Sequence, residues 1–204
     1  MAHLILPKAN LNALIRKRRQ TGHDRYDEVW NGVYVMSPIA DNNHQWIASK
    51  LTIILYQALG AIAEKHIFTG TNISDQPVDW TKNYRVPDVA IFLPGNPAED
   101  RNTHWFGGPD FAVEVISKGD QSRKKFDFYA KVGVRELLLI DRYPWRLELF
   151  RNDGVEMKRA GSIAPGDSDR IVSKVLPVSF RLIESREKLA IEVNQTVDGR
   201  VWRT

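Results

Sequence analysis

The sequence predicts a three-layer α/β fold in which a central mixed sheet is flanked by helices. Three short, nearly continuous apolar runs, at residues 86–92, 111–116 and 136–140, are typical of central strands covered on both faces. A helical pattern at residues 120–132 separates the last two runs, and this strand–helix–strand order predicts a right-handed crossover between parallel neighbours. A longer helical pattern at residues 42–65 precedes them and should pack its apolar face against the core.

The earlier part of the chain predicts a short helix within its first 20 residues and then a β-hairpin. Two β-prone runs flank Asn31-Gly32, which is the strongest short-range sequence signal for a two-residue hairpin turn. Asp41 is placed to be the N-cap of the long helix, because its carboxylate can accept hydrogen bonds from the first helical N–H groups. The inward face of that helix begins with His44 and continues at helical spacing through Ile47, Leu51, Ile54, Ala58 and Ile62.

The remaining segments are shorter and more irregular. Residues 67–80 should form a strand followed by irregular chain, and a polar loop rich in glycine and proline follows at residues 94–109. Residues 146–151 and 171–182 predict two further strands. The second is broken by Pro177, because proline cannot donate to a sheet ladder.

The length of 204 residues fits a single domain with short extensions. We expect the domain to span residues 23–185, with a helical N-terminal extension at residues 1–22 and a C-terminal extension at residues 186–204. The sequence contains no apolar stretch long enough to cross a bilayer, and it begins without a secretion signal. Cysteine is absent, which excludes disulfides and thiolate metal sites and fits a reducing, cytoplasmic location.

Positive charge is slightly in excess. The formal net charge of +4 favours polyanionic partners, but the distribution of the charge says more than its total. Arg16-Lys17-Arg18-Arg19 and Arg123-Lys124-Lys125 are the two basic runs. The first is about as often a solvated helix face as a nucleic-acid contact, so charge by itself does not establish a function.

Two acids interrupt the apolar runs. Asp88 and Glu114 each lie in a segment that should be buried, where an ionised carboxylate is costly unless it is paired, hydrogen-bonded or bound to a cation. Alternation along the strand places Glu114 on the face opposite Val113 and Val115. The two acids can point the same way from adjacent strands, and a divalent cation would relieve their repulsion. Ligands that are all oxygen favour Mg²⁺ or Mn²⁺ over zinc.

Lys125 is the third unusual residue. It shares one helical face with Phe128, Tyr129 and Val132, and therefore lies on the apolar stripe that should pack against the sheet. A lysine there either extends to the rim of the core or reaches an acid. A structural ion pair is the simpler explanation. Two acids and one lysine leave excess negative charge, however, and a bound cation would balance it, so we favour a metal-dependent catalytic site.

The order of these residues resembles the PD-(D/E)XK nuclease superfamily and, more narrowly, the Uma-family endonucleases, a group also described as restriction endonuclease domains. Pro87-Asp88 followed after a loop by Glu114-Val115-Ile116-Ser117 is the centre of the likeness. These short motifs are weak alone, and their order and context make the match specific. The other matching blocks, which extend the likeness over residues 25–182, are Asp27-Glu28-Val29-Trp30-Asn31-Gly32, Met36-Ser37-Pro38, His44, Lys125, Tyr129-Ala130-Lys131-Val132-Gly133-Val134, Asp141, Val172-Ser173 and Leu176-Pro177.

The resemblance implies a restriction-endonuclease-like fold and a metal site. Asp88, Glu114 and the backbone carbonyl of Val115 would be the ligands of Mg²⁺ or Mn²⁺. Glu28 corresponds to an upstream acid that is often placed near such sites. It would act there with a second ion or a water molecule.

The resemblance also implies that the lysine of the superfamily motif has moved. Ile116 stands at its usual strand position, so Lys125 on the following helix would replace it, in agreement with the argument from the helical face. Two departures affect this region. Family members commonly carry an aspartate one turn before the helix lysine, where this chain has Gln121, and a proline where it has Lys118. Lys118 is a competing catalytic lysine, ranked lower because it lies past the end of the strand.

The leading hypothesis is an endonuclease that hydrolyses DNA phosphodiester bonds with a water activated by Mg²⁺ or Mn²⁺. Asp88, Glu114, Lys125 and Glu28 would be its catalytic residues, and a homodimer would suit cutting of both strands. The alternatives are a catalytically inactive nuclease-fold protein that binds nucleic acid or a protein partner, and an assembly component with a structural site. Four further residues would contact phosphate or DNA: His44, Lys118, Arg123 and Lys124.

Overall fold

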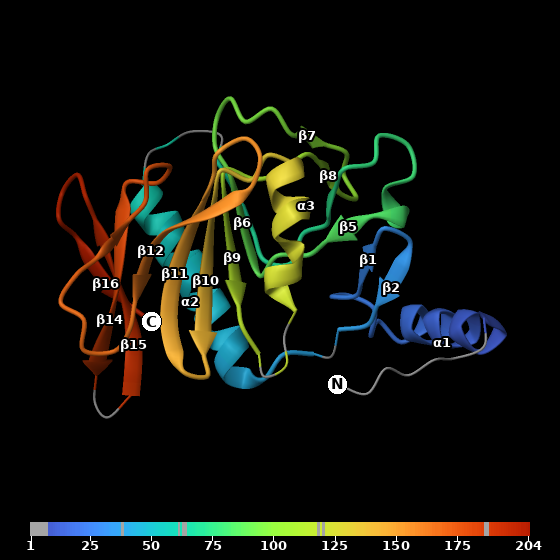
Figure 1. The fold of residues 1–204 in the computed structure, drawn as a ribbon, viewed down its shortest axis with the longest axis horizontal. Helices are drawn as coiled ribbons and strands as arrows, with labels where there is room; N and C mark the ends of the chain where they lie inside the picture. The colour runs from blue at the N-terminus through green and yellow to red at the C-terminus, as the bar shows by residue number, and fades with distance from the viewer. Residues whose placement is uncertain are drawn as a thin grey trace.

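A six-stranded mixed sheet lies at the centre of the molecule (Figure 1). The structure is a computed structural model that describes residues 8–37, 39–60, 62, 65–117, 119, 121–185 and 188–204. The strands of the central sheet are β3 (His66–Phe68), β6 (Val89–Phe92), β9 (Phe111–Val115), β10 (Glu136–Arg142), β11 (Trp145–Asn152) and β12 (Met157–Ile163). Their order is β12–β11–β10–β9–β6–β3, with β9 parallel to β10 and the other neighbours antiparallel. The predicted parallel pair is therefore confirmed.

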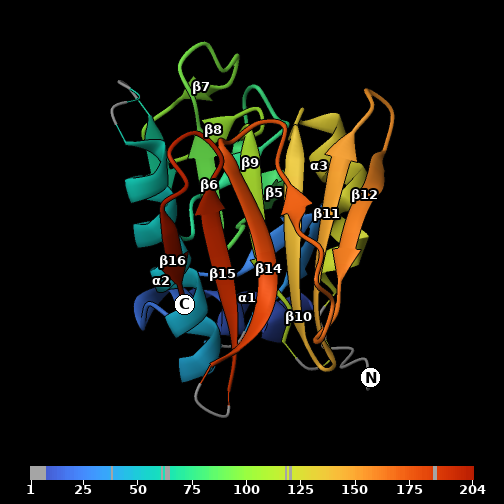
Figure 2. The ribbon, with the colours of Figure 1, turned by 90° about the vertical axis from the view of Figure 1, so that its left-hand side faces the viewer.

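One face of the central sheet is covered by a long helix and by a second sheet, which lie side by side (Figure 2). The helix is α2 (Asn42–Leu59), and it begins at the predicted N-cap, where the Asp41 carboxylate accepts a hydrogen bond of 2.8 Å from the N–H of His44. Apolar side chains of both elements pack against the alternate β9 residues Phe111, Val113 and Val115. The second sheet is antiparallel and consists of β13 (Ile171–Val172), β14 (Val178–Ser185), β15 (Lys188–Gln195) and β16 (Val201–Arg203).

The opposite face carries a short helical segment and a third sheet. A 3-10 turn, η2 (Ser122–Lys125), runs into α3 (Phe126–Lys131), whose Phe128 and Tyr129 share an apolar cluster with Ala112 of β9. The third sheet has the order β2–β1–β5–β4–β8–β7, and β1 and β2 form the hairpin predicted at Asn31-Gly32. Its strands are β1 (Glu28–Trp30), β2 (Val33–Val35), β4 (Ile73–Ser74), β5 (Tyr84–Arg85), β7 (Glu99–Asp100) and β8 (Trp105–Phe106), with the 3-10 turn η1 (Trp80–Lys82) between β4 and β5.

The predicted three-layer α/β fold is confirmed, with three differences in detail. Helix α2 ends at Leu59, earlier than expected, because Gly60 adopts a positive φ and leaves the helix. The helix expected over residues 120–132 is shorter and starts as a 3-10 turn, and residue 120 itself lies outside the described residues. The layer beside α2 is completed by strands, and six strands were not predicted: β5, β7, β8, β12, β15 and β16. Of these, β7 and β8 lie within the loop expected at residues 94–109. Residues 188–204 therefore pack as strands against the core.

The N-terminal segment forms the expected helix, α1 (Lys8–Gln20). Arg18, from the first basic run, makes an ion pair of 2.6 Å with the buried carboxylate of Asp27, whereas Arg16, Lys17 and Arg19 are exposed. This run is thus partly a structural contact. Among the described residues, the helices are all too short or too polar to span a membrane.

Candidate active site

The predicted catalytic side chains meet at one cavity of about 460 Å³, between the first turn of α2 and the end of β9. Glu28, Asp88, Glu114 and Lys125 all line it. They come from four separate elements or their ends: β1, the residue before β6, β9 and η2. Three further polar residues line the same cavity: Asp41, Ser117 and His44, which the sequence predicts as a phosphate or DNA contact.

Lys125 lies between two buried carboxylates. Its Nζ is 2.9 Å from Oε1 of Glu114 and 2.9 Å from Oε1 of Glu28. It is buried together with Phe128 and Tyr129, while its neighbour Lys124 is exposed. The face that the helical spacing predicted to be buried therefore points inward, and it brings Lys125 to the two acids.

Glu114 is the centre of this cluster, with a side chain only 4% exposed. It projects from β9 on the side of Ala112, opposite the face that packs on α2. Its Oε1 also accepts a hydrogen bond from the Tyr129 hydroxyl, and its Oε2 accepts a longer one, 3.4 Å, from Oγ of Ser122. The two hydroxyl groups and the ammonium group of Lys125 together fix the orientation of this carboxylate.

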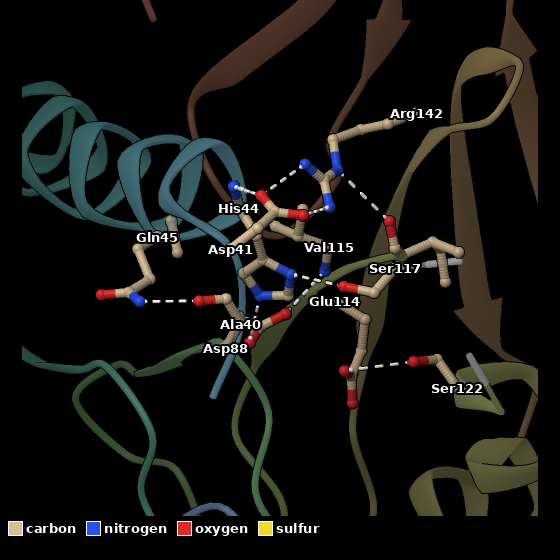
Figure 3. A network of polar contacts seen from close by, with 12 residues as sticks. Ala40, Asp41, His44, Gln45, Asp88, Glu114, Val115, Ser117, Ser122 and Arg142 are labelled. Atoms are coloured by element: carbon tan, nitrogen blue, oxygen red, sulfur yellow. Dashed lines mark hydrogen bonds and ion pairs between the residues drawn. The ribbon is translucent and has the colours of Figure 1, made fainter. Parts of the chain in front are cut away.

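Asp88 lies at a more open position, with 20% of its side chain exposed. Its Oδ2 accepts a hydrogen bond of 2.7 Å from the backbone N–H of Val115, which ties the start of β6 to the end of β9. Its Oδ1 is 2.9 Å from Nε2 of His44. Figure 3 shows Asp88 between the histidine ring and the β9 backbone. Asp88 is therefore the acid of the cluster that has most access to the cavity.

Burial and charge act in opposite directions on the two central groups. Burial raises the pKa of Glu114 to about 7 against the opposing effect of Lys125, and the charges of Asp88 and Glu28 add to the rise. Burial lowers the pKa of Lys125, but the carboxylates of Glu114 and Glu28 outweigh burial, so that its pKa is raised. Lys125 therefore stays an ammonium ion, and Glu114 is protonated more easily than an ordinary glutamate.

Glu28 is held rigidly by its neighbours and lies near a second buried cation. Its Oε1 accepts from the N–H of Val86 at 2.8 Å, and its Oε2 accepts from Nε1 of Trp30 at 2.6 Å. Arg85 lies between the rings of Trp30 and Phe128, at 4.8 and 4.3 Å from their centroids. Burial lowers the pKa of Arg85, and the charge of Glu28 opposes that effect.

Arg85 changes the charge balance inferred from the sequence. Glu28 and Glu114 are two negative charges, and Lys125 and Arg85 supply two positive charges. The negative charge in excess is therefore that of Asp88, which faces His44. Sequence reasoning missed Arg85 because a single arginine in a short strand carries no periodic signal.

The other predicted contact residues are spread around the cavity. His44 uses both ring nitrogens within the protein, with Asp88 at 2.9 Å and Oγ of Ser117 at 3.1 Å. Arg123 and Lys124 line an adjoining pocket of about 380 Å³, which shares Ser117 with the main cavity. Arg123 also pairs with Glu148. Lys118 lies outside the described residues.

The donor set fits a hard divalent cation. Asp88 and Glu114 present carboxylate oxygens to the same cavity, and each Asp88 oxygen accepts one protein hydrogen bond although it has two lone-pair positions. Within the described part of the chain, no group of three or more histidine, aspartate and glutamate side chains is placed to hold a metal ion. Two carboxylates are nevertheless enough for Mg²⁺ or Mn²⁺, which are bound through one or two carboxylates with water and substrate oxygens.

The fold and this site together define a nuclease-like α/β protein. Residues 15–185 match the Uma2 family, described as "Putative restriction endonuclease", and the chain belongs to that family. The resemblance seen in the sequence is thereby confirmed.

The fold is similar to a solved structure described as a "putative nuclease belonging to DUF820" from Anabaena variabilis ATCC 29413. The TM-score is 0.58 at 16% sequence identity, over 74% of this chain and 83% of that chain. At this identity the similarity concerns the fold alone. No curated protein matches the sequence.

Proposed function

We propose that this protein is an endonuclease that hydrolyses DNA phosphodiester bonds with the help of Mg²⁺ or Mn²⁺. The observation that carries the proposal is the position of Lys125, whose ammonium group bridges Glu28 and Glu114 at the wall of a cavity that Asp88 also lines. A purely structural ion pair needs no cavity beside it. Family membership and the nuclease fold support the same class of reaction.

Asp88, Glu114 and the backbone carbonyl of Val115 would hold the ion. When bound, it would supply an activated water and positive charge for the phosphate. Since its pKa is raised, Lys125 is a poor general base, and its role is to stabilise the charge that develops on the phosphate. Lys125 also fixes the orientation of Glu114, while Glu28 keeps the ammonium group in place from the other side.

The substrate would be gripped by its phosphates rather than by its bases. Arg123 and Lys124 line the pocket next to the cavity, where cationic side chains can contact the strand on one side of the scissile bond. Binding should therefore weaken with salt and depend little on sequence. We also propose a homodimer, since one cavity per chain cuts one strand, and a cytoplasmic location, which the absence of cysteine supports.

The decisive experiment is incubation of supercoiled plasmid DNA with the protein in Mg²⁺ or Mn²⁺, in parallel with chelator. An RNA transcript of the same sequence tests the preference for DNA. The Asp88→Ala and Lys125→Ala variants, purified identically, should not cut. Equal cutting by the wild type and both variants would identify a contaminating nuclease and contradict the proposal.

Binding without cutting would favour the alternative function. If the wild type binds DNA in a salt-dependent way but leaves it intact with either ion, the protein is a nucleic-acid-binding member of the nuclease fold. If it neither binds nor cuts, a structural or protein-binding role is the explanation that survives.

A further inference from the structure

A chain of polar contacts leads from Asp88 to the end of β10. Arg142, the last residue of β10, forms a two-pronged ion pair with Asp41, with 2.9 Å from Nη1 to Oδ1 and 2.9 Å from Nη2 to Oδ2. Asp41 in turn caps α2 by accepting from the N–H of His44. His44 then reaches Asp88 and Ser117 (Figure 3). The contacts thus connect the end of β10 to Asp88 through the first turn of α2.

The geometry of the ion pair is that of a fixed anchor. The Arg142 side chain is 2% exposed, and its Nε also donates to the carbonyl of Ile116 at 3.4 Å. A guanidinium that meets a carboxylate at two points fixes orientation as well as distance. The Arg142 anchor thereby sets the position of the α2 N-terminus relative to β9 and β10, and with it the position of His44.

We propose that Arg142 and Asp41 are positioning residues, which hold His44 so that it keeps Asp88 directed into the cavity. This inference rests on the proposed function, because it assigns Asp88 to a metal ion. Residues that orient a ligand through hydrogen bonds affect metal affinity strongly, by about 10–100-fold. Neither Arg142 nor Asp41 belongs to the set of four proposed catalytic residues, and both act on Asp88 through His44.

The test is the affinity for Mn²⁺ alone, measured by titration calorimetry without nucleic acid. Arg142→Met removes the buried charge, and Asp41, whose side chain is 53% exposed, can then be solvated and still cap α2. We expect the Mn²⁺ dissociation constant to rise by about tenfold. Arg142→Lys, which retains the charge but loses the two-pronged geometry, should have an intermediate effect.

The matched control is the ion pair at the other end of the same strand. Glu136 begins β10 and pairs with Arg151 at 2.7 Å, so Arg151→Met removes a comparable contact of β10 away from the cavity. We expect this variant to lose at least as much thermal stability as Arg142→Met and to bind Mn²⁺ like the wild type. A second readout is DNA cutting, where saturating Mn²⁺ should restore most of the rate of Arg142→Met.

The outcomes separate this inference from the proposed function. If the wild type binds Mn²⁺ and Arg142→Met binds it equally well, the positioning role is wrong and the nuclease proposal stands. If Arg151→Met loses as much Mn²⁺ affinity as Arg142→Met, the effect is one of general stability, which also overturns the positioning role. If the folded wild type binds no Mn²⁺, the proposed metal site fails and takes this inference with it.

Discussion

Glu114 on β9 and Glu192 on β15 are both carboxylates in the middle of a strand, and their surroundings are opposite. Glu114 is one of three acids that share the lysine-centred site with Asp88 and Glu28. Glu192, 2% exposed, forms ion pairs with a cluster of arginines. Three side chains surround it: Arg170, Arg181 and Arg203.

The difference separates the carboxylate of the proposed active site from a structural one. The pKa of Glu192 is lowered, because the hydrogen bonds from Arg181 and Arg203 outweigh its burial. The pKa of Glu114 is raised to about 7, because burial and neighbouring acids outweigh Lys125. Both carboxylates are buried. Of the two, Glu114 lies beside a cavity with fewer cations than acids, which is the arrangement that we propose binds a metal ion.

Neutralising each glutamate in turn should give the largest difference between the two sites. Glu114→Gln removes a proposed ligand and the acceptor for Lys125, and we expect the rate of DNA cutting to fall by about 10³-fold or more. Glu192→Gln should leave the rate unchanged in the same plasmid assay, because Glu192 belongs to a different sheet. Loss of cutting in both variants, with both folded by circular dichroism, would mean that the two carboxylates do not differ in the way proposed.

Removal of one cation from each cluster should have unequal effects on stability. Lys125→Met leaves Glu28 and Glu114 buried without their shared partner, and we expect the free energy of unfolding at pH 8 to fall by about 3–5 kcal/mol. Arg203→Met leaves Glu192 with two arginines, and Arg203 is itself mostly exposed, so the loss should be below about 1 kcal/mol. Urea unfolding measures both, and similar losses would contradict the contrast.

The pH dependence of stability should have opposite signs at the two sites. The raised pKa of Glu114 means that the folded state holds its proton more tightly, so this contribution to stability is lost as pH rises from about 4.5 through about 7. The lowered pKa of Glu192 gives a contribution that is lost as pH falls below about 4.5.

Urea unfolding in chelator across this range is the corresponding measurement. Glu114→Gln should flatten the decline towards neutral pH, and Glu192→Gln should flatten the decline in acid. Addition of Mn²⁺ should also reduce the decline towards neutral pH in the wild type, since a bound cation favours the charged form of Glu114. An unchanged pH profile in Glu114→Gln would show that this carboxyl has an ordinary pKa.

The sequence was informative where a residue conflicted with its surroundings. Asp88 and Glu114 interrupt apolar runs, and Lys125 lies on an apolar helical face, so elementary burial arguments found them. Glu28 came only from family resemblance, because β1 is too short for a periodic pattern. Arg85 and Arg142 were missed for a related reason: each lies just outside an apolar run, and only the tertiary contacts reveal that they are buried.

Some of the unpredicted strands carry a sequence signal and others do not. β12 is polar along most of its length and exists because β11 pairs with it at the edge of the central sheet. β15 carried a usable signal, since Leu189, Ile191 and Val193 alternate with smaller or polar residues. The parallel pairing of β9 and β10 was predictable because the chirality of strand–helix–strand connections leaves few alternatives.

The strands β14 and β15 also have a consequence for the order of events during protein synthesis. They pack beside α2 on the same face of the central sheet, and Nε2 of Gln195 donates to the carbonyl of Ala58 across a separation of 137 residues. At typical translation rates of about 5–20 residues per second, the ribosome needs on the order of ten seconds to span that distance. Every residue of the candidate active site is thus made before β14 and β15, and the apolar face of the central sheet that these strands cover stays exposed until then, where a chaperone can bind it.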